Sequence, residues 1–445
     1  MKADIIAFIQ KALRQFVRPT LLYKGVSKQV FPHNPTPRLR VAARFRGLVY
    51  ELKNRNTVYN LGSLSTLPHP IATGIYRRFI GFNPGNLGNW SDDESGSYAT
   101  TQMEYEVVHD LIDLYRGDHK KLGGYITSGG TEGNIFSVWL GKTYLEKHNK
   151  PHEICLLKTS LTHYSVRKAG QISGLPQFFL PLNKVDWNID IQGFEYLIRR
   201  LYNRGYRGFI IPLTIGYTPT GTSDNVKMIT RVADSLKKKL KGVKFYFWID
   251  AALNGLIAPF IHGDFRPFQS GHIQTMLVDF HKFGLVPYQA GVVLYQKHLR
   301  KLIEQPIDYL AEKDSTLLGS RSGVPAVSIW GMIHSMGKSG YRHLVEKQME
   351  NKKYFLERVR LVLPEVEIVT HPSSLSCGLL FRGLKASRLP VWIEEKYNLY
   401  PGKTKVLFYP SEEKTYVIYK CFFLPYLNRR ILVEFLKDLQ KVQNT

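Results

Sequence analysis

The segment with the clearest chemical potential is Asp279-Phe-His281-Lys282-Phe. The apolar run before it, Ile273 to Val278, predicts a buried strand, and Gly284 and Pro287 after it predict a loop. A strand end is a rigid place from which to project one amine into a cleft. Such an amine can form a Schiff base with an aldehyde cofactor, and a buried or cation-flanked lysine loses its proton more readily. A His-Lys pair alone is weak evidence, because a lysine at a strand end more often extends to solvent.

A second segment, Ser128-Gly-Gly-Thr-Glu-Gly-Asn134, opens a predicted helix over Ile135 to His148. A glycine-rich turn at a helix start exposes N–H groups at the positive end of the helix dipole, where anions bind. The hydroxyl of Thr131 adds a donor suited to a phosphate. Taken alone, the segment would more simply be a helix cap provided by Ser128 or Thr131.

Two further residues, Asp250 and His163, suit an aromatic cofactor. Asp250 ends the apolar run Phe245 to Ile249, a predicted strand. A carboxylate there can pair with a pyridinium nitrogen and keep it protonated, which makes the ring an electron sink. His163 follows the predicted strand Ile154 to Leu157 and could stack flat on such a ring. Either residue alone is more often a helix or turn cap or a hydrogen-bonded core residue. The evidence for a cofactor site is therefore the combination of these segments.

These segments together resemble the pyridoxal-phosphate-dependent group II decarboxylases. That family includes histidine, tyrosine, aspartate, glutamate and aromatic amino-acid decarboxylases, with sphingosine-phosphate lyase as a relative. The resemblance covers roughly residues 85 to 345 and includes a further motif, Leu318-Gly-Ser-Arg-Ser-Gly323. It implies an α/β fold of type I, with a mostly parallel seven-stranded sheet in a large domain and a smaller C-terminal α+β domain. The implied cofactor is pyridoxal 5'-phosphate.

The resemblance also implies roles for individual residues. Lys282 would carry the cofactor, Asp250 would pair with the pyridine nitrogen, and His163 would stack on the ring. Arg321 lies where a substrate carboxylate is expected, Tyr309 is the candidate lid tyrosine for reprotonation, and no metal is expected. The implied cofactor-binding set is Ser128, Gly130, Thr131, His163, Thr218, Asp250, Ala252, His281 and Lys282, with Gly319 and Ser320 reaching the phosphate from the neighbouring subunit.

Two positions depart from the family pattern. Many members have Ser or Asn three residues before the lysine, whereas this chain has Asp279, which should repel a phosphate unless it faces away or accepts a hydrogen bond. Archaeal tyrosine/aspartate decarboxylases and the lyase branch resemble this chain there, so the change indicates a subgroup. Tyr217 stands where the family usually has a threonine, which leaves Thr218 as the candidate contact to the ring hydroxyl.

Composition agrees with a cytoplasmic enzyme. The 445 residues can bury a large core and form two domains, and three cysteines in apolar settings argue against a disulfide framework. No membrane span or signal peptide is apparent in the sequence. The formal charge of +25 could attract nucleic acid, anionic lipid or a phosphorylated substrate. No nucleic-acid-binding motif is apparent, so we expect a solvated basic surface and no nucleic-acid partner.

The chain reads as three regions: an N-terminal helical arm (residues 1–85), a large cofactor-binding domain (86–330) and a small C-terminal domain (331–445). In the large region, strand-like runs alternate with helical patterns, which predicts a mostly parallel sheet covered on both faces, with ligands at the carboxyl ends of its strands. The runs start or lie at Tyr125, Ile154, Gln177, Phe209, Phe245, Thr275 and Ala290. In the small region, helices are predicted over Gly340–Val362 and Ile431–Val442, and strands over Val366–Val369, Cys377–Phe381, Val406–Tyr409 and Tyr416–Phe422.

The N-terminal region holds two helical patterns separated by the proline-rich stretch Pro32 to Pro37. The first, within residues 5–17, has an apolar face with basic residues around it, as in helices that lie on a membrane surface. An arm packed on a partner subunit is favoured over membrane contact, because apolar helical faces usually bury against protein.

The expected function is decarboxylation of an L-amino acid to its amine and carbon dioxide by a homodimer with shared active sites. One alternative is a carbon–carbon lyase acting on a phosphorylated long-chain amino alcohol, which would share the site chemistry and suit the positive charge. A second is a basic binding protein on a degenerate enzyme scaffold. Four residues argue against a degenerate scaffold, because a non-catalytic protein has no need for all of them: Lys282, Asp250, His163 and Thr131.

Overall fold

The computed structural model describes residues 37–55, 59–64, 67–87, 99–261, 263–308, 312–382, 384 and 387–443. The chain divides into two compact units, residues 1–60 and 61–445. In the described part of the first unit, α3 (Arg38–Arg55) forms the second of the two helices predicted for the N-terminal region. The first predicted helix lies outside the described residues.

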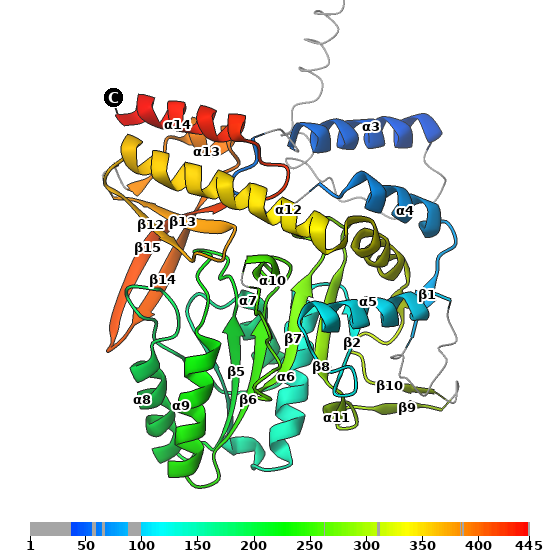
Figure 1. Ribbon diagram of the computed structural model, residues 1–445, viewed down its shortest axis with the longest axis vertical. Helices are drawn as coiled ribbons and strands as arrows, with labels where there is room; N and C mark the ends of the chain where they lie inside the picture. Colours follow the sequence, from blue (N-terminus) through cyan, green and yellow to red (C-terminus); the bar gives the residue numbers. More distant parts are fainter. Residues whose placement is uncertain are drawn as a thin grey trace, which may run out of the picture. The chain divides into compact units, whose positions relative to one another are not determined.

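A seven-stranded sheet organises the second unit (Figure 1). The strand order is β2-β8-β7-β6-β5-β3-β4, in which β8 runs antiparallel to both neighbours and the other pairs are parallel. This mostly parallel sheet confirms the predicted fold class, and each predicted strand-like run falls in or beside one of its strands. The strands are β2 (Leu122–Thr127), β3 (Ile154–Lys158), β4 (Gln177–Phe179), β5 (Gly208–Thr214), β6 (Lys244–Asp250), β7 (Ile273–Asp279) and β8 (Gly291–Gln296).

Both faces of this sheet are buried, as the continuous apolar runs predict. In β5 every residue is buried. In β6 the side chains alternate: Tyr246 and Trp248 join a core cluster with Phe136 of α6 (Gly130–Glu146), while Phe245 and Phe247 form an aromatic stack that continues toward Phe194 of α8 (Ile191–Asn203). Fixed between two apolar layers, the strand ends are rigid supports for functional side chains.

A second sheet lies in the C-terminal part of the chain, in the order β12-β13-β15-β14, with every neighbouring pair antiparallel. Its strands are β12 (Val366–Thr370), β13 (Ser376–Phe381), β14 (Pro401–Phe408) and β15 (Glu412–Phe422). The sequence predicted only the apolar halves of the last two strands. The polar halves, such as Pro401–Lys405, form strands because β14 pairs with β15 along its full length. The apolar periodicity of a single segment does not predict such pairing.

Helices complete the second unit. The long α12 (Val324–Val362) contains one non-helical residue, Gly337, with φ 59° and ψ 179°, and the predicted helix from Gly340 follows this break. The closing helix α14 (Arg429–Gln443) is also as predicted. The remaining elements are α4 (Pro70–Ile80), β1 (Gly85–Asn86), α5 (Thr101–Leu114), η1 (Pro151–Glu153), α7 (Tyr164–Ile172), α9 (Val226–Lys239), α10 (Ala258–Ile261), α11 (Lys297–Arg300), β9 (Gln305–Ile307), β10 (Glu312–Asp314), β11 (Arg321–Ser322) and α13 (Val391–Lys396). Among the described residues, no helix is both long and apolar enough to cross a bilayer.

Candidate active site

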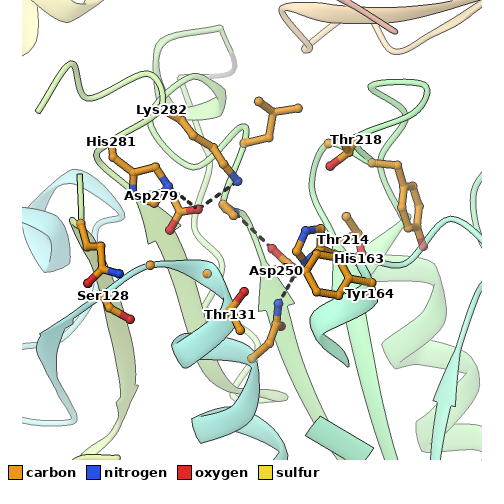
Figure 2. A pocket seen from close by; sticks show the side chains of 18 of the residues that line it. Ser128, Thr131, His163, Tyr164, Thr214, Thr218, Asp250, Asp279, His281 and Lys282 are labelled. Carbon is orange, nitrogen blue, oxygen red and sulfur yellow. Dashed lines mark hydrogen bonds and ion pairs between the residues drawn. The ribbon is translucent and has the colours of Figure 1, made fainter. Parts of the chain in front are cut away.

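The predicted chemical groups meet at the carboxyl ends of the central strands (Figure 2). Asp250 is the last residue of β6, and Lys282 lies in the turn that follows β7. They line a cavity of about 460 Å³, a size suited to a small cofactor and its substrate. The predicted residues that line this cavity are Ser128, Gly130, Thr131, His163, Thr218, Asp250, Ala252, His281 and Lys282.

The amine of Lys282 forms a buried ion pair with Asp279. Lys282 Nζ lies 2.9 Å from Asp279 Oδ2, and His281 Nε2 lies 3.5 Å from the same oxygen. Burial lowers the pKa of Lys282, but the Asp279 carboxylate, with smaller contributions from Asp250 and Tyr288, outweighs it and leaves that pKa above its ordinary value. Burial therefore acts in the expected direction, but the neighbouring carboxylate of Asp279 favours the protonated amine more strongly. Asp279 accepts a hydrogen bond from Lys282. This meets one of the two conditions under which the sequence allows an aspartate beside a phosphate site.

Asp250 is held by two hydrogen bonds within the cavity wall. The backbone N–H of Ala252 donates to its Oδ1 at 3.2 Å, and Asn134 Nδ2 donates to its Oδ2 at 2.9 Å. His163 is the N-cap of α7 and lies beside Asp250 (Figure 2). Burial lowers the pKa of His163, opposed by the charge of Asp250, so the ring is neutral near pH 7. A neutral flat ring next to a carboxylate suits a site for a cationic aromatic ring.

The start of α6 forms the predicted anion cradle. Its N-cap, Gly129, has φ 140°, a conformation that glycine adopts readily, and it offers no side chain to cap the first-turn N–H groups. A Cβ at Gly129 would lie 2.8 Å from His281 Cε1, so a larger residue would fill the space between the turn and the imidazole. Thr131 and Ser128 add hydroxyl groups to the same wall of the cavity. These donors fit a phosphate group.

Tyr217 is a core residue at the wall of the cavity. Its side chain is buried, and its hydroxyl donates to Asp224 Oδ2 at 2.7 Å and accepts from Thr159 Oγ1 at 3.2 Å. Burial raises the pKa of Asp224 to about 6. Because the Tyr217 hydroxyl is engaged in this network, Thr218 is left as the neighbouring hydroxyl on the cavity wall.

The segment containing Gly319, Ser320 and Arg321 lies outside this cavity. Ser320 and Arg321 line an adjoining cavity of about 370 Å³, which shares Ser128, Tyr288 and Gln289 with the first. Gly319 lines neither cavity. Tyr309 falls outside the described residues.

The guanidinium of Arg321 is engaged within its own chain. Its Nη2 donates to both carboxylate oxygens of Glu104, at 3.0 and 3.1 Å, and its Nη1 donates to Thr316 Oγ1 at 3.0 Å. The side chains of Arg321 and Glu104 are 6% and 5% exposed, and the guanidinium also lies over the ring of Tyr125. The substrate-carboxylate role stays a prediction, but this geometry favours a structural role for Arg321.

We therefore expect Arg321→Ala to lower stability by about 3–5 kcal/mol, because it leaves the buried Glu104 carboxylate without its counter-ion. Urea unfolding of the cofactor-loaded protein measures this. A matched control is Arg199→Ala, which breaks the more exposed pair with Glu195 and should cost less than about 1 kcal/mol. An Arg321→Ala protein of parental stability but with a strongly raised KM would instead restore the substrate role.

Sequence reasoning missed the contribution of several residues that shape the site. Asn134 was visible in the glycine-rich motif but had no assigned role, although it holds Asp250. Tyr288 also lines the cavity, with its ring centroid 4.2 Å from that of His281. Tyr288 lies in a loop with no distinctive motif, so the sequence carries no signal for it. Asn134 does carry a sequence signal, because it is a polar residue directly before the apolar helical run that begins at Ile135.

Comparisons with known proteins identify the family of the chain. A family model described as the pyridoxal-dependent decarboxylase conserved domain matches residues 93–381. The chain is 29% identical to a probable L-tyrosine/L-aspartate decarboxylase of Methanococcus maripaludis, over 68% of this chain and 76% of that protein. It is 28% identical to the L-aspartate/L-glutamate decarboxylase of Pyrococcus horikoshii, over 86% of this chain and 91% of the relative.

Solved structures show the same fold. The L-methionine decarboxylase of Streptomyces sp. 590 superposes with a TM-score of 0.77 at 18% identity, over 93% of this chain and 97% of that one. The sphingosine-1-phosphate lyase of Burkholderia pseudomallei gives a TM-score of 0.74 at 17% identity, over 96% and 94%. Fold and site thus define a pyridoxal-phosphate enzyme of fold type I. The chain belongs to the pyridoxal-dependent decarboxylase family, a family of carboxy-lyases whose cofactor is pyridoxal phosphate.

Proposed function

We propose that this protein removes the α-carboxylate of an L-amino acid, producing the amine and carbon dioxide. The observation that carries the proposal is the convergence of Lys282 and Asp250, from adjacent strands, on one cavity beside His163. The two sequence relatives named above are amino-acid decarboxylases, and both match over more than two thirds of their own length, which supports decarboxylation over cleavage of a phosphorylated amino alcohol.

Each residue has a task in this proposal. Bound pyridoxal phosphate supplies a sink for the electrons released when the Cα–carboxylate bond breaks. Lys282 would hold the cofactor covalently through its amine. Asp250 would keep a proton on the pyridine nitrogen, and His163 would support the ring. The first turn of α6, with Ser128, Gly130 and Thr131, holds the phosphate together with His281, while Thr218 and Ala252 complete the wall.

We further propose a cytoplasmic homodimer in which Gly319 and Ser320 complete the partner's site and Tyr309 serves as the lid tyrosine. Gly319 has a positive φ of 61°, which glycine adopts readily in a tight turn, and it lies outside the cavity of its own chain, where it is free of a role in that cavity. The division into an arm (1–85), a large domain (86–330) and a small domain (331–445) is part of the same proposal.

Product analysis tests the function directly. The purified, cofactor-loaded protein is incubated with each of the common L-amino acids and with a phosphorylated long-chain amino alcohol, and amines, carbon dioxide and aldehydes are measured. Carbon dioxide and the matching amine in equal amounts from one or a few amino acids would support decarboxylation. An aldehyde from the amino alcohol, with no amine from any amino acid, would overturn it in favour of carbon–carbon cleavage.

A further inference from the structure

A buried chain of hydrogen bonds joins Asp250 to His163 through Asn134. Trp248 Nε1 lies 2.9 Å from Asn134 Oδ1, and both side chains are at most 1% exposed. An indole N–H can only donate, so the oxygen of the Asn134 amide must face Trp248. The direction of this one bond therefore fixes the orientation of the whole amide.

With its oxygen committed to Trp248, Asn134 turns its NH₂ group toward the active site. One N–H donates to Asp250 Oδ2 at 2.9 Å, and the other to Ser165 Oγ at 3.0 Å. An NH₂ group has two protons and no acceptor, so both contacts can only be donations. The amide thus requires an acceptor oxygen at Asp250.

The chain ends at the ring of His163. Because Ser165 Oγ accepts from Asn134, its hydroxyl proton is available for His163 Nδ1, 2.7 Å away. The backbone N–H of Ser165 also approaches Nδ1, at 3.4 Å. Two donors facing Nδ1 make it an acceptor, so the neutral ring carries its proton on Nε2.

We propose that Asn134 is a positioning residue that sets, from the single donor of Trp248, both the acceptor state of Asp250 and the tautomer of His163. The inference rests on the roles proposed above for Asp250 and His163. With pyridoxal phosphate bound, Asp250 would then be the charged partner of the pyridine nitrogen, and the neutral His163 imidazole would not repel the positive charge on that ring. Asn134 also lines the cavity, and in this proposal it acts through Asp250 and, by way of Ser165, through His163.

The charges around His163 are consistent with this control. Asp250 faces it from β6, Asp279 and Lys282 face it from the end of β7, and Lys168 faces it from α7. Two carboxylates and two ammonium groups carry no net formal charge, and burial favours the neutral ring, so the hydrogen-bond direction at Nδ1 decides which nitrogen carries the single proton.

The test is ¹⁵N NMR of histidine-labelled, cofactor-free protein, with His163→Gln to assign the ring signals. Near neutral pH the parent should show His163 Nδ1 unprotonated and Nε2 protonated. In Asn134→Asp, Trp248 can still donate, but the introduced carboxylate accepts where the amide donated. The Ser165 hydroxyl then donates to the introduced carboxylate and no longer to His163, so Nδ1 loses its shorter donor. The added negative charge and this lost donor should together raise the pKa of the imidazole by about one unit or more and allow a proton on Nδ1.

Three further variants sharpen the result. Trp248→Phe removes the donor that orients the amide, so the two tautomers of His163 should become mixed. Ser165→Ala removes the hydroxyl that links Asn134 to His163. In that background, Asn134→Asp should therefore give a smaller change in the pKa of His163. Asn149→Asp, a buried amide whose Nδ2 donates to Gly242 O, is the matched control and should leave the His163 signals unchanged.

Cofactor affinity, measured by fluorescence titration with pyridoxal phosphate, should fall at least about tenfold in Asn134→Asp, the effect of roughly one pKa unit of altered charge interaction. A parent His163 with its proton on Nδ1 would overturn the proposal. So would unchanged His163 signals in a folded Asn134→Asp or, if that variant does not fold, in Trp248→Phe. These spectra do not depend on catalytic turnover. The NMR result can therefore be interpreted even if the decarboxylation assay shows no activity.

Discussion

Lys282→Ala is expected to abolish covalent attachment of pyridoxal phosphate and all measurable turnover. Lys282 is the lysine that lines the described cavity, and its amine faces the space between Asp279 and Asp250 (Figure 2). Borohydride reduction followed by intact mass measurement detects the lysine–cofactor adduct directly. The parent should gain the mass of one reduced cofactor per chain, and the variant should gain none.

Removing Lys282 also leaves the buried Asp279 carboxylate without its ion-pair partner, so misfolding could imitate the expected loss. Lys282→Arg addresses this, because arginine keeps the positive charge but stays protonated and cannot attack an aldehyde. It should remain folded and still form no adduct. Lys142→Ala, near the other end of α6, is the control that should retain the adduct. An adduct of normal yield in Lys282→Arg would show that another lysine is the attachment point.

Asp250→Asn is expected to lower kcat by about 10²-fold or more, a loss typical of removing one preorganised electrostatic interaction from an active site. An asparagine cannot keep a pyridine nitrogen protonated by charge. Its amide also fits the existing contacts poorly, since Asn134 and the Ala252 N–H both donate to this side chain. Steady-state kinetics with the amino acid found in the product panel measures the effect, together with a shift in the absorbance of the bound cofactor.

The matched control is Asp190→Asn at the N-cap of α8, where asparagine caps about as well as aspartate. It should leave kcat and stability near the parental values. If Asp250→Asn retains near-normal turnover with a folded structure, Asp250 is a structural cap and the proposed charge on the ring is wrong.

The sequence determined the large elements of the fold because their signals are local. Uninterrupted apolar runs such as Phe245–Ile249 mark strands buried on both faces, and their alternation with helical patterns is enough to predict a parallel sheet. The strand-end positions of Asp250 and Lys282 followed from the same runs, since parallel strands share one carboxyl edge. The rest of the cofactor-binding set was implied by the family resemblance and did not follow from these runs.

The polar halves of the strands in the C-terminal sheet could not be predicted from local apolar patterns. Residues 401–405 have no alternating apolar pattern, and β14 lies at the sheet edge, where one side is free for polar residues. Backbone pairing with β15 extends this strand, and pairing depends on a segment that follows later in the chain.

The electrostatic state of the site was decided by tertiary structure alone. Asn134 and Asp250 are 116 positions apart, and Glu104 and Arg321 are 217 apart, yet each pair is in direct contact. The sequence determined which groups could do chemistry: an amine, a carboxylate, an imidazole and an anion cradle. Only the folded chain decided that the Lys282 amine is held protonated by Asp279, that Arg321 is bound by Glu104, and that Trp248 orients Asn134. Hydrogen-bond direction and ion pairing depend on the neighbours that packing brings within about 3 Å, and those neighbours come from distant segments.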